Sequence, residues 1–131
     1  MDIKKQFGTD EKKELEGVVH DLGEGAKVRV ARIGNPKFKL VFNRLTKPHK
    51  QMMQRGTLPE ATGDSILIRA MAETILLDWE GIEEDGTPVE YNKEEVIRLL
   101  TEYKDFRDLI ANLASDMDSF KSLADEELKG N

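Results

Sequence analysis

The sequence predicts an α+β fold that is mostly α, with an N-terminal β-hairpin followed by about four to five helices. Two short apolar runs, "GVVHDL" and "KVRVARI", flank the turn sequence "GEGA" and indicate the hairpin. Across the rest of the chain, apolar residues recur every three or four positions, which is the spacing of one helix face. A two-stranded hairpin is not stable alone, so we expect it to lie against the helices.

Length and composition fit one domain without covalent cross-links. A chain of 131 residues is long enough to bury a core, and the absence of cysteine removes disulfides and thiolate zinc sites. No apolar run approaches the roughly 20 residues of a membrane span, so we expect a protein without a membrane partner. We predict a single domain over residues 17–124, preceded by a flexible N-terminal arm, 1–16, and followed by a polar tail, 125–131.

The first elements of this domain are the hairpin, at 17–33, and two helices. Asn35 and Pro36 match the N-cap and first-turn preferences of a helix, which is predicted over about 36–46. A second, shorter helix is predicted at 47–55. The residue directly after it is a glycine, a common C-terminal stop.

The clearest helix is predicted over residues 58–79. Thr57 and Glu60 stand three positions apart before an apolar run, which is the pattern of a capping box. The apolar face of this helix would hold residues spaced by four: Leu67, Met71, Ile75 and Trp79. We therefore expect Trp79 to lie in the last turn of the helix and to fix that end in the core.

The last third of the chain is predicted to hold two helices, at 93–103 and 105–123. Asn92 and Glu95 match the capping pattern of the first. A stripe of apolar residues steps alternately by three and four: Val96, Leu99, Tyr103, Phe106, Ile110, Leu113, Met117 and Phe120. The stripe is long enough for a coiled coil of about three and a half heptads. Its aromatic side chains and the mixed charges between them favour packing against the rest of the domain instead.

A carboxylate-rich stretch, "LDWEGIEEDGTPVEYNKEE", connects the central helix to the last two. When Gly86 is placed at the sixth position of a calcium loop, the first and twelfth positions are Gly81 and Asn92, so both required ligands are missing. We interpret the stretch as a structural joint between two helices. Its motif residues are Asp78, Trp79, Gly81, Asp85, Gly86, Asn92 and Glu95.

The sequence assigns no catalytic, metal-binding or cofactor-binding residue. The two histidines, His20 and His49, lack the spacing of a helical metal site, and surface positions are the simpler interpretation for both. A carboxylate pair such as Asp78 and Glu80 stays open as an acid and a base. Acidic residues are too abundant here for any one pair to be informative.

The net charge of −6 is distributed unevenly along the chain. Residues 1–24 have a net charge of −3, residues 25–55 have +9 without one acidic side chain, and residues 56–131 have −12. These blocks either neutralise each other inside one fold or attract a second copy or an acidic partner. The basic block also stays open as a nucleic-acid contact. Candidate residues for a partner or self-association surface are Arg29, Arg32, Lys37, Lys39, Arg44, Lys47, Lys50, Met52 and Met53.

The order of these parts resembles the tail assembly chaperone family of long-tailed bacteriophages. The resemblance covers roughly residues 17 to 120 and rests on "VARIGNPKF", "AMAETILLDWEGIEEDGTPVEYNKEEVIRLL", "DFRDLI" and "ASDMDSF". Its sharpest element is an alanine-rich helix that ends in Asp-Trp and is followed by an acidic Asp-Gly turn and a capped helix. The segment "TEYKD" departs from the family, whose members often have a proline there, so whether the last two helices merge is open at this point.

The resemblance implies a protein without enzymatic activity and without a cofactor. Members of that family bind the tape measure protein in the host bacterial cytoplasm, help the major tail protein to assemble around it, and leave before the virion is complete. They commonly self-associate and occur in a short and a frameshifted longer form, of which this chain would be the short one. Two alternatives stay open: a structural or connector protein of the phage tail, and a small nucleic-acid-binding protein that uses residues 25–55.

Overall fold

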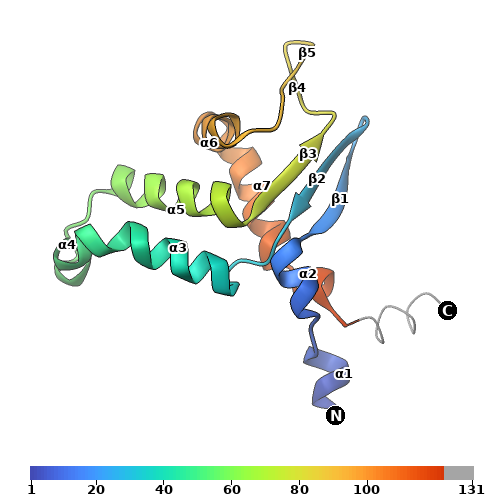
Figure 1. Cartoon of the computed structure of the whole chain (residues 1–131), viewed down its shortest axis with the longest axis horizontal. Coiled ribbons are helices and arrows are strands. Elements are labelled where there is room, and N and C mark those ends of the chain that lie inside the picture. The colour runs from blue at the N-terminus through green and yellow to red at the C-terminus, as the bar shows by residue number, and fades with distance from the viewer. Residues whose placement is uncertain (123–131) are drawn as a thin grey trace.

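The computed structural model describes residues 1–122, and in them the predicted fold class, α+β with mostly helix, is confirmed (Figure 1). An antiparallel sheet has the strand order β1-β2-β3, in which β1 is Val18–Gly23, β2 is Ala26–Val30 and β3 is Leu76–Glu80. The predicted N-terminal hairpin is therefore present. It is completed by a strand from the middle of the chain, which gives the hairpin the support that two strands lack on their own.

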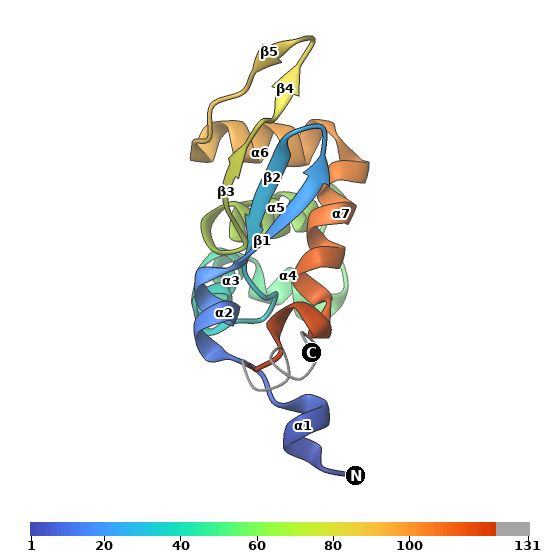
Figure 2. The ribbon, with the colours of Figure 1, turned by 90° about the vertical axis from the view of Figure 1, so that its right-hand side faces the viewer.

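The segment predicted as a flexible arm, 1–16, forms two short helices, α1 (Ile3–Phe7) and α2 (Glu11–Glu16). Each helix begins after an aspartate, Asp2 or Asp10, whose side chain accepts hydrogen bonds from backbone N–H groups of the first turn. The two helices differ in their surroundings, because α1 projects beyond the other described elements while α2 lies against them (Figure 2).

Backbone hydrogen bonds hold α2 in place. The N–H of Asp10 donates to the carbonyl of Phe120 (2.9 Å), and the N–H of Arg32 donates to the carbonyl of Glu14 (2.9 Å). These bonds join the segment around α2 both to the end of the hairpin and to the last described turn of the chain.

After the hairpin, the chain forms α3 (Pro36–Thr46), the 3₁₀ turn η1 (Lys47–His49) and α4 (Lys50–Arg55). Asn35 is the N-cap, since its side-chain oxygen accepts a hydrogen bond from the Phe38 N–H (3.0 Å). These elements extend to one side of the sheet, and α3 packs on α5 (Figure 1). We call residues 36–55 the helical lobe.

The prediction of a helix over 58–79 is wrong in its second part. α5 covers Glu60–Thr74 and is followed directly by strand β3. The predicted capping box is also wrong, because the N-cap is Pro59 without a side-chain hydrogen bond, and the Thr57 hydroxyl donates back to the Met52 carbonyl (3.4 Å).

Trp79 consequently lies on a strand rather than in a last helical turn. It is paired with Val28 of β2 in the antiparallel register. Its indole Nε1–H donates to the Val89 carbonyl (2.8 Å), and its ring meets the edge of the Tyr91 ring at a centroid distance of 5.1 Å. Trp79 lies in the core, as predicted, at 7% exposure, but it fixes the loop that follows a strand and not the end of a helix.

That loop is a joint between a strand and a helix, where the sequence predicted a joint between two helices. It holds a small hairpin of β4 (Glu83–Glu84) and β5 (Thr87–Pro88). Asp85 and Gly86 form its corner with φ of 51° and 78°, the left-handed geometry that an Asp-Gly turn adopts. At Gly81 a Cβ would come within 2.2 Å of a carbonyl oxygen in the β1–β2 turn, so only glycine allows this close approach.

Helix α6 covers Lys93–Glu102 and begins as the sequence predicts. The Asn92 side-chain oxygen accepts a hydrogen bond from the Glu95 N–H (2.9 Å). This bond satisfies one of the free N–H groups at the helix start and fixes the direction in which α6 leaves the loop.

The last two helices do not merge. α6 and α7 (Lys104–Ser115) are separated at Tyr103, whose backbone is not helical (φ −111°, ψ 86°). The predicted helix at 105–123 is too long, because α7 ends at Ser115 and the chain continues as a 3₁₀ turn, η2 (Met117–Phe120). The predicted polar tail, 125–131, lies outside the described residues.

The core lies between the sheet and the helices α5, α6 and α7 (Figure 2). Val28 and Val30 of β2 face this core and are 1% and 0% exposed. Apolar side chains of the three helices, among them Met71, Leu100 and Ile110, are equally buried. We call the sheet together with α6, α7 and η2 the body of the protein.

Candidate partner-binding surface

The helical lobe is attached to the rest of the chain by one apolar side of α3. Phe38 and Phe42 lie on this side, half-buried, with their rings stacked at a centroid distance of 5.6 Å and an interplanar angle of 16°. Because these rings are used in packing, they are not free to stack on nucleobases. The opposite side of α3 and most of α4 face outward.

The three arginines among the candidate surface residues make contacts within the chain. Arg29 donates a hydrogen bond to a backbone carbonyl of α2. Arg32 lies 3.5 Å from the Glu14 carboxylate and 5.8 Å from the centre of the Phe120 ring. Arg44 pairs with Glu73 of α5 at 2.8 Å. These arginines hold α2 and α3 in place, so part of the basic block serves the fold itself.

The remaining candidates lie on the outside of the lobe. Four lysines are exposed, and no ion pair within residues 1–122 involves any of them: Lys37, Lys39, Lys47 and Lys50. Met52 and Met53 are 38% and 41% exposed. The structure thus keeps six of the nine predicted residues available for a partner.

Leu40 belongs to the same surface and was missed by the sequence analysis. It is 72% exposed in the middle of α3. The signal was present, because Leu40 is an apolar residue that lies off the face formed by Phe38, Phe42 and Leu45. We call the four lysines, the two methionines and Leu40 the lobe surface.

A shallow groove of about 420 Å³ lies beside the lobe surface, between the end of α3 and the start of α5. Leu45 and His49 line one side, and Ile66 and Arg69 line the other. Because the lining mixes apolar and polar groups, the groove resembles a contact surface for a peptide or helix more than a closed small-molecule pocket.

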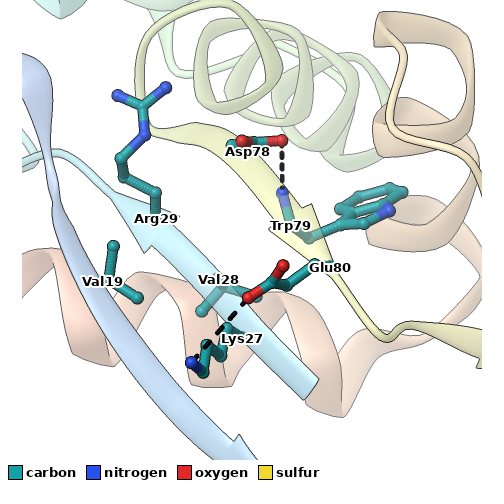
Figure 3. A pocket seen from close by; sticks show the side chains of 7 residues that line it. All are labelled: Val19, Lys27, Val28, Arg29, Asp78, Trp79 and Glu80. Carbon is teal, nitrogen blue, oxygen red and sulfur yellow. Dashed lines mark hydrogen bonds and ion pairs between the residues drawn. The ribbon is translucent and has the colours of Figure 1, made fainter. Parts of the chain in front are cut away.

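The outer face of the sheet holds a second hollow, of about 260 Å³ (Figure 3). The carboxylates considered as an acid and a base lie here, and each stands opposite a basic residue of β2. Asp78 is paired in register with Arg29, and Glu80 lies 3.9 Å from Lys27. Neither histidine lines the hollow. Opposite charges on neighbouring strands stabilise the sheet, and this is the role that the geometry supports.

The two histidines are half-buried, whereas the sequence analysis placed them on the surface. His20 is on the inner face of β1, and its Nε2 is buried without a hydrogen-bond partner among the described residues. Burial lowers the pKa of its imidazole, an effect that the charge of Asp116 opposes. Between residues 1 and 122, no three His, Asp or Glu side chains gather in a way that could hold a metal ion.

A charged cluster fastens the β4–β5 hairpin to α6. Arg98 donates to both carboxylate oxygens of Glu84 (3.1 Å each) and also contacts Glu95 (2.7 Å). The Tyr103 hydroxyl donates to Glu84 as well. Arg98 first, and then Tyr103, hold the pKa of the Glu84 carboxyl below its usual value. The cluster therefore has a structural role.

None of the helices in the described part of the chain is both long and apolar enough to cross a membrane. The chain matches no curated protein and no solved structure. It does match the profile of the family described as YdaY prophage protein, over residues 33–131. The matched region includes the whole lobe, the sheet strand β3 and both C-terminal helices. Since this is well over half of the sequence, the chain is phage-derived and belongs to the YdaY prophage protein family.

Proposed function

We propose that this protein is a non-enzymatic phage tail assembly chaperone. It would bind the tape measure protein in the host bacterial cytoplasm, help to recruit the major tail protein, and leave before the virion is complete. The prophage family supports a role in the phage life cycle. The resemblance of residues 17–120 to tail assembly chaperones supports this particular role.

One observation carries the proposal: the lobe surface presents apolar side chains beside unpaired lysines. Among the described residues, 1–122, none buries Leu40, Met52 or Met53. Methionine adapts its shape to varied partners, and helical partners are commonly held by an exposed apolar surface. Lysines around such a surface favour a partner helix with acidic residues beside its apolar face.

The direct test is co-expression of the protein with the tape measure protein of the same phage. The wild-type chain should raise the soluble yield of that protein and co-purify with it. A variant with Leu40→Ser, Met52→Ser and Met53→Ser should lose most of this effect, because exposed apolar contacts at the centre of an interface contribute most to affinity.

The matched control changes three apolar residues of similar exposure outside the lobe: Val19→Ser, Leu109→Ser and Met117→Ser. These side chains are 59%, 38% and 37% exposed. Circular dichroism should show that both triple variants remain folded. If the wild-type protein fails to co-purify, the chaperone function is wrong; if the control loses binding as fully as the lobe variant, the lobe surface is not the binding site.

The exposed lysines also favour a second candidate, a nucleic-acid-binding protein. Such binding would weaken steeply as salt rises, since lysines would displace counterions from phosphates. Replacing the four lysines of the lobe surface by glutamine should then abolish a gel shift of DNA or RNA. The alternative of a structural or connector protein predicts that the chain remains in purified virions, which mass spectrometry of virions would detect.

A further inference from the structure

The N-terminal helix α1 presents apolar side chains that no other part of residues 1–122 buries. Ile3 is 69% exposed and Phe7 is 54% exposed, and no residue of α1 is buried. The two side chains are four positions apart, so they lie on the same side of the helix. Lys4 lies beside this apolar side, whereas Lys5, two positions from both Ile3 and Phe7, lies on the opposite side of the helix. A helix this short is marginal in water without a partner, so a surface that buries Ile3 and Phe7 would stabilise it.

A groove with the complementary character lies where β4, α6 and the start of α7 meet. Its volume is about 490 Å³, within the range of ligand-binding pockets. Leu22, Ile82, Leu99 and Phe106 give it an apolar lining. We call it the acidic groove because Glu83, Asp85 and Asp105 also line it.

The charges at this groove are available to a partner. Glu84, which lines it too, is already paired with Arg98. Glu83, Asp85 and Asp105, by contrast, are exposed and take part in no ion pair within residues 1–122. The acidic groove therefore combines an apolar lining with three negative charges that are unpaired within residues 1–122, and α1 combines an apolar side with a positive charge, Lys4, beside it.

The two surfaces lie at opposite ends of the molecule. In both Figure 1 and Figure 2, α1 is at the end near the N-terminus, while the β4–β5 hairpin and α6 are at the other end. A helix held at one end cannot fill a groove at the other end of the same chain. The occupant that fits is α1 of another copy.

We propose that α1 of one copy inserts Ile3 and Phe7 into the acidic groove of a second copy, with Lys4 facing Glu83 and Asp105. Each copy then offers one helix and one groove, so the contact is head-to-tail and generates a closed ring or an open filament. The area that so short a helix can bury is small. The association is therefore weak, depends on protein concentration, and weakens as salt screens the charges.

This inference deepens the self-association expected of a tail assembly chaperone, and it is tested with the purified full-length chain alone. If the chain failed to bind the tape measure protein, the proposed self-association would not be contradicted. Sedimentation velocity over a range of concentrations should show the wild-type chain growing beyond a monomer. Ile3→Ser with Phe7→Ser should raise the dissociation constant at least about tenfold, while the control Val19→Ser with Met117→Ser should not change it.

Charge reversal tests the pairing itself. Lys4→Glu should weaken association, and so should Glu83→Lys with Asp105→Lys. A mixture of these two variants should associate more strongly than either alone, because the reversed helix of one fits the reversed groove of the other. This rescue cannot arise from misfolding.

Three results would overturn the proposal: a wild-type chain that stays monomeric at every concentration, an Ile3/Phe7 variant with unchanged association, or a mixture without rescue. A further variant tests the alternative route, in which the basic lobe meets an acidic region of the next copy. Replacing the four lysines of the lobe surface by glutamine should leave association unchanged, and loss of association in that variant would favour the lobe route.

Discussion

The body and the helical lobe differ in what their helices bury. α6 and α7 place Leu100 and Ile110 in the core at 0% exposure, whereas the only buried residue of α3 and α4 is Thr46, at the end of α3. The lobe also leaves Leu40 largely exposed. The difference shows that the helices of the body supply much of the buried core, while α3 and α4 supply almost none of it.

The sharpest way to test this difference is to shorten one apolar side chain in each region. Ile110→Ala should lower the free energy of unfolding by about 2–5 kcal/mol, because it leaves a cavity in a closed core. Leu40→Ala on the lobe should change it by less than about 0.5 kcal/mol, because the side chain is in water in both states. Urea denaturation of both variants measures the effect. Similar losses in the two variants would mean that the lobe is as important for stability as the body.

Asn35 connects the body to the helical lobe, and replacing it should have the next largest effect on stability. Asn35 is 3% exposed; its oxygen caps α3, and its amide nitrogen donates to the Arg32 carbonyl (2.8 Å) and lies 3.5 Å from the Thr74 carbonyl. Asn35→Ala should cost about 1–3 kcal/mol, because it removes the cap and leaves buried backbone groups without a partner.

The control for this joint is Asn35→Ser, which keeps a capping oxygen and loses the amide donors. It should recover part of the stability that Asn35→Ala loses, as measured by thermal and urea unfolding. If serine and alanine destabilise equally, the cap contributes nothing measurable. The hydrogen bonds of the amide nitrogen would then account for the whole effect.

The sequence predicts local features well where the responsible contacts are themselves local. The caps at Asn35 and Asn92 depend on a side chain and a backbone group three residues away, and both are present. The Asp85-Gly86 corner is likewise decided by the conformations that those two residues prefer. Hydrophobic periodicity in the same way identifies α3 and α6.

The prediction failed where a distant strand decides the local structure. Residues 67 to 79 have apolar positions four apart, and nothing local distinguishes the end of this pattern from a helix. What ends α5 after Thr74 is the free edge of β2, which pairs with residues 76–80 and accepts Trp79 opposite Val28. Tertiary contacts of this kind override local propensity.

The candidate surface was predictable only in part, because contacts with distant elements decide which of its residues are exposed. Composition identified the basic block, and the exposed lysines and methionines of the lobe are in it. Composition could not separate these residues from Arg29, Arg32 and Arg44, because their acceptors lie in α2 and α5. The acidic groove was not predictable at all, since Leu22, Ile82 and Phe106 are brought together only by the fold.

The smallest expected effect concerns His20 on the inner face of β1. Because burial holds the pKa of its imidazole below the ordinary value of 6.5, the unfolded chain takes up a proton at a higher pH than the folded chain does. The stability that the neutral, buried imidazole of His20 contributes is therefore complete above pH 6.5. It is lost as the pH falls from there through the lower pKa of the folded state. His20→Leu should remove this part of the pH dependence of unfolding and leave the rest.

Asp116 provides the matched control, because its negative charge raises the pKa of His20 and so opposes the effect of burial. Asp116→Asn should lower that pKa further and make the loss of stability below pH 6.5 larger than in the wild-type protein. Urea denaturation between pH 5 and pH 8, with NMR titration of the imidazole, measures both quantities. A smaller loss in the Asp116 variant would contradict the assignment, because it would mean that His20 is protonated in the folded body more readily than its buried position allows.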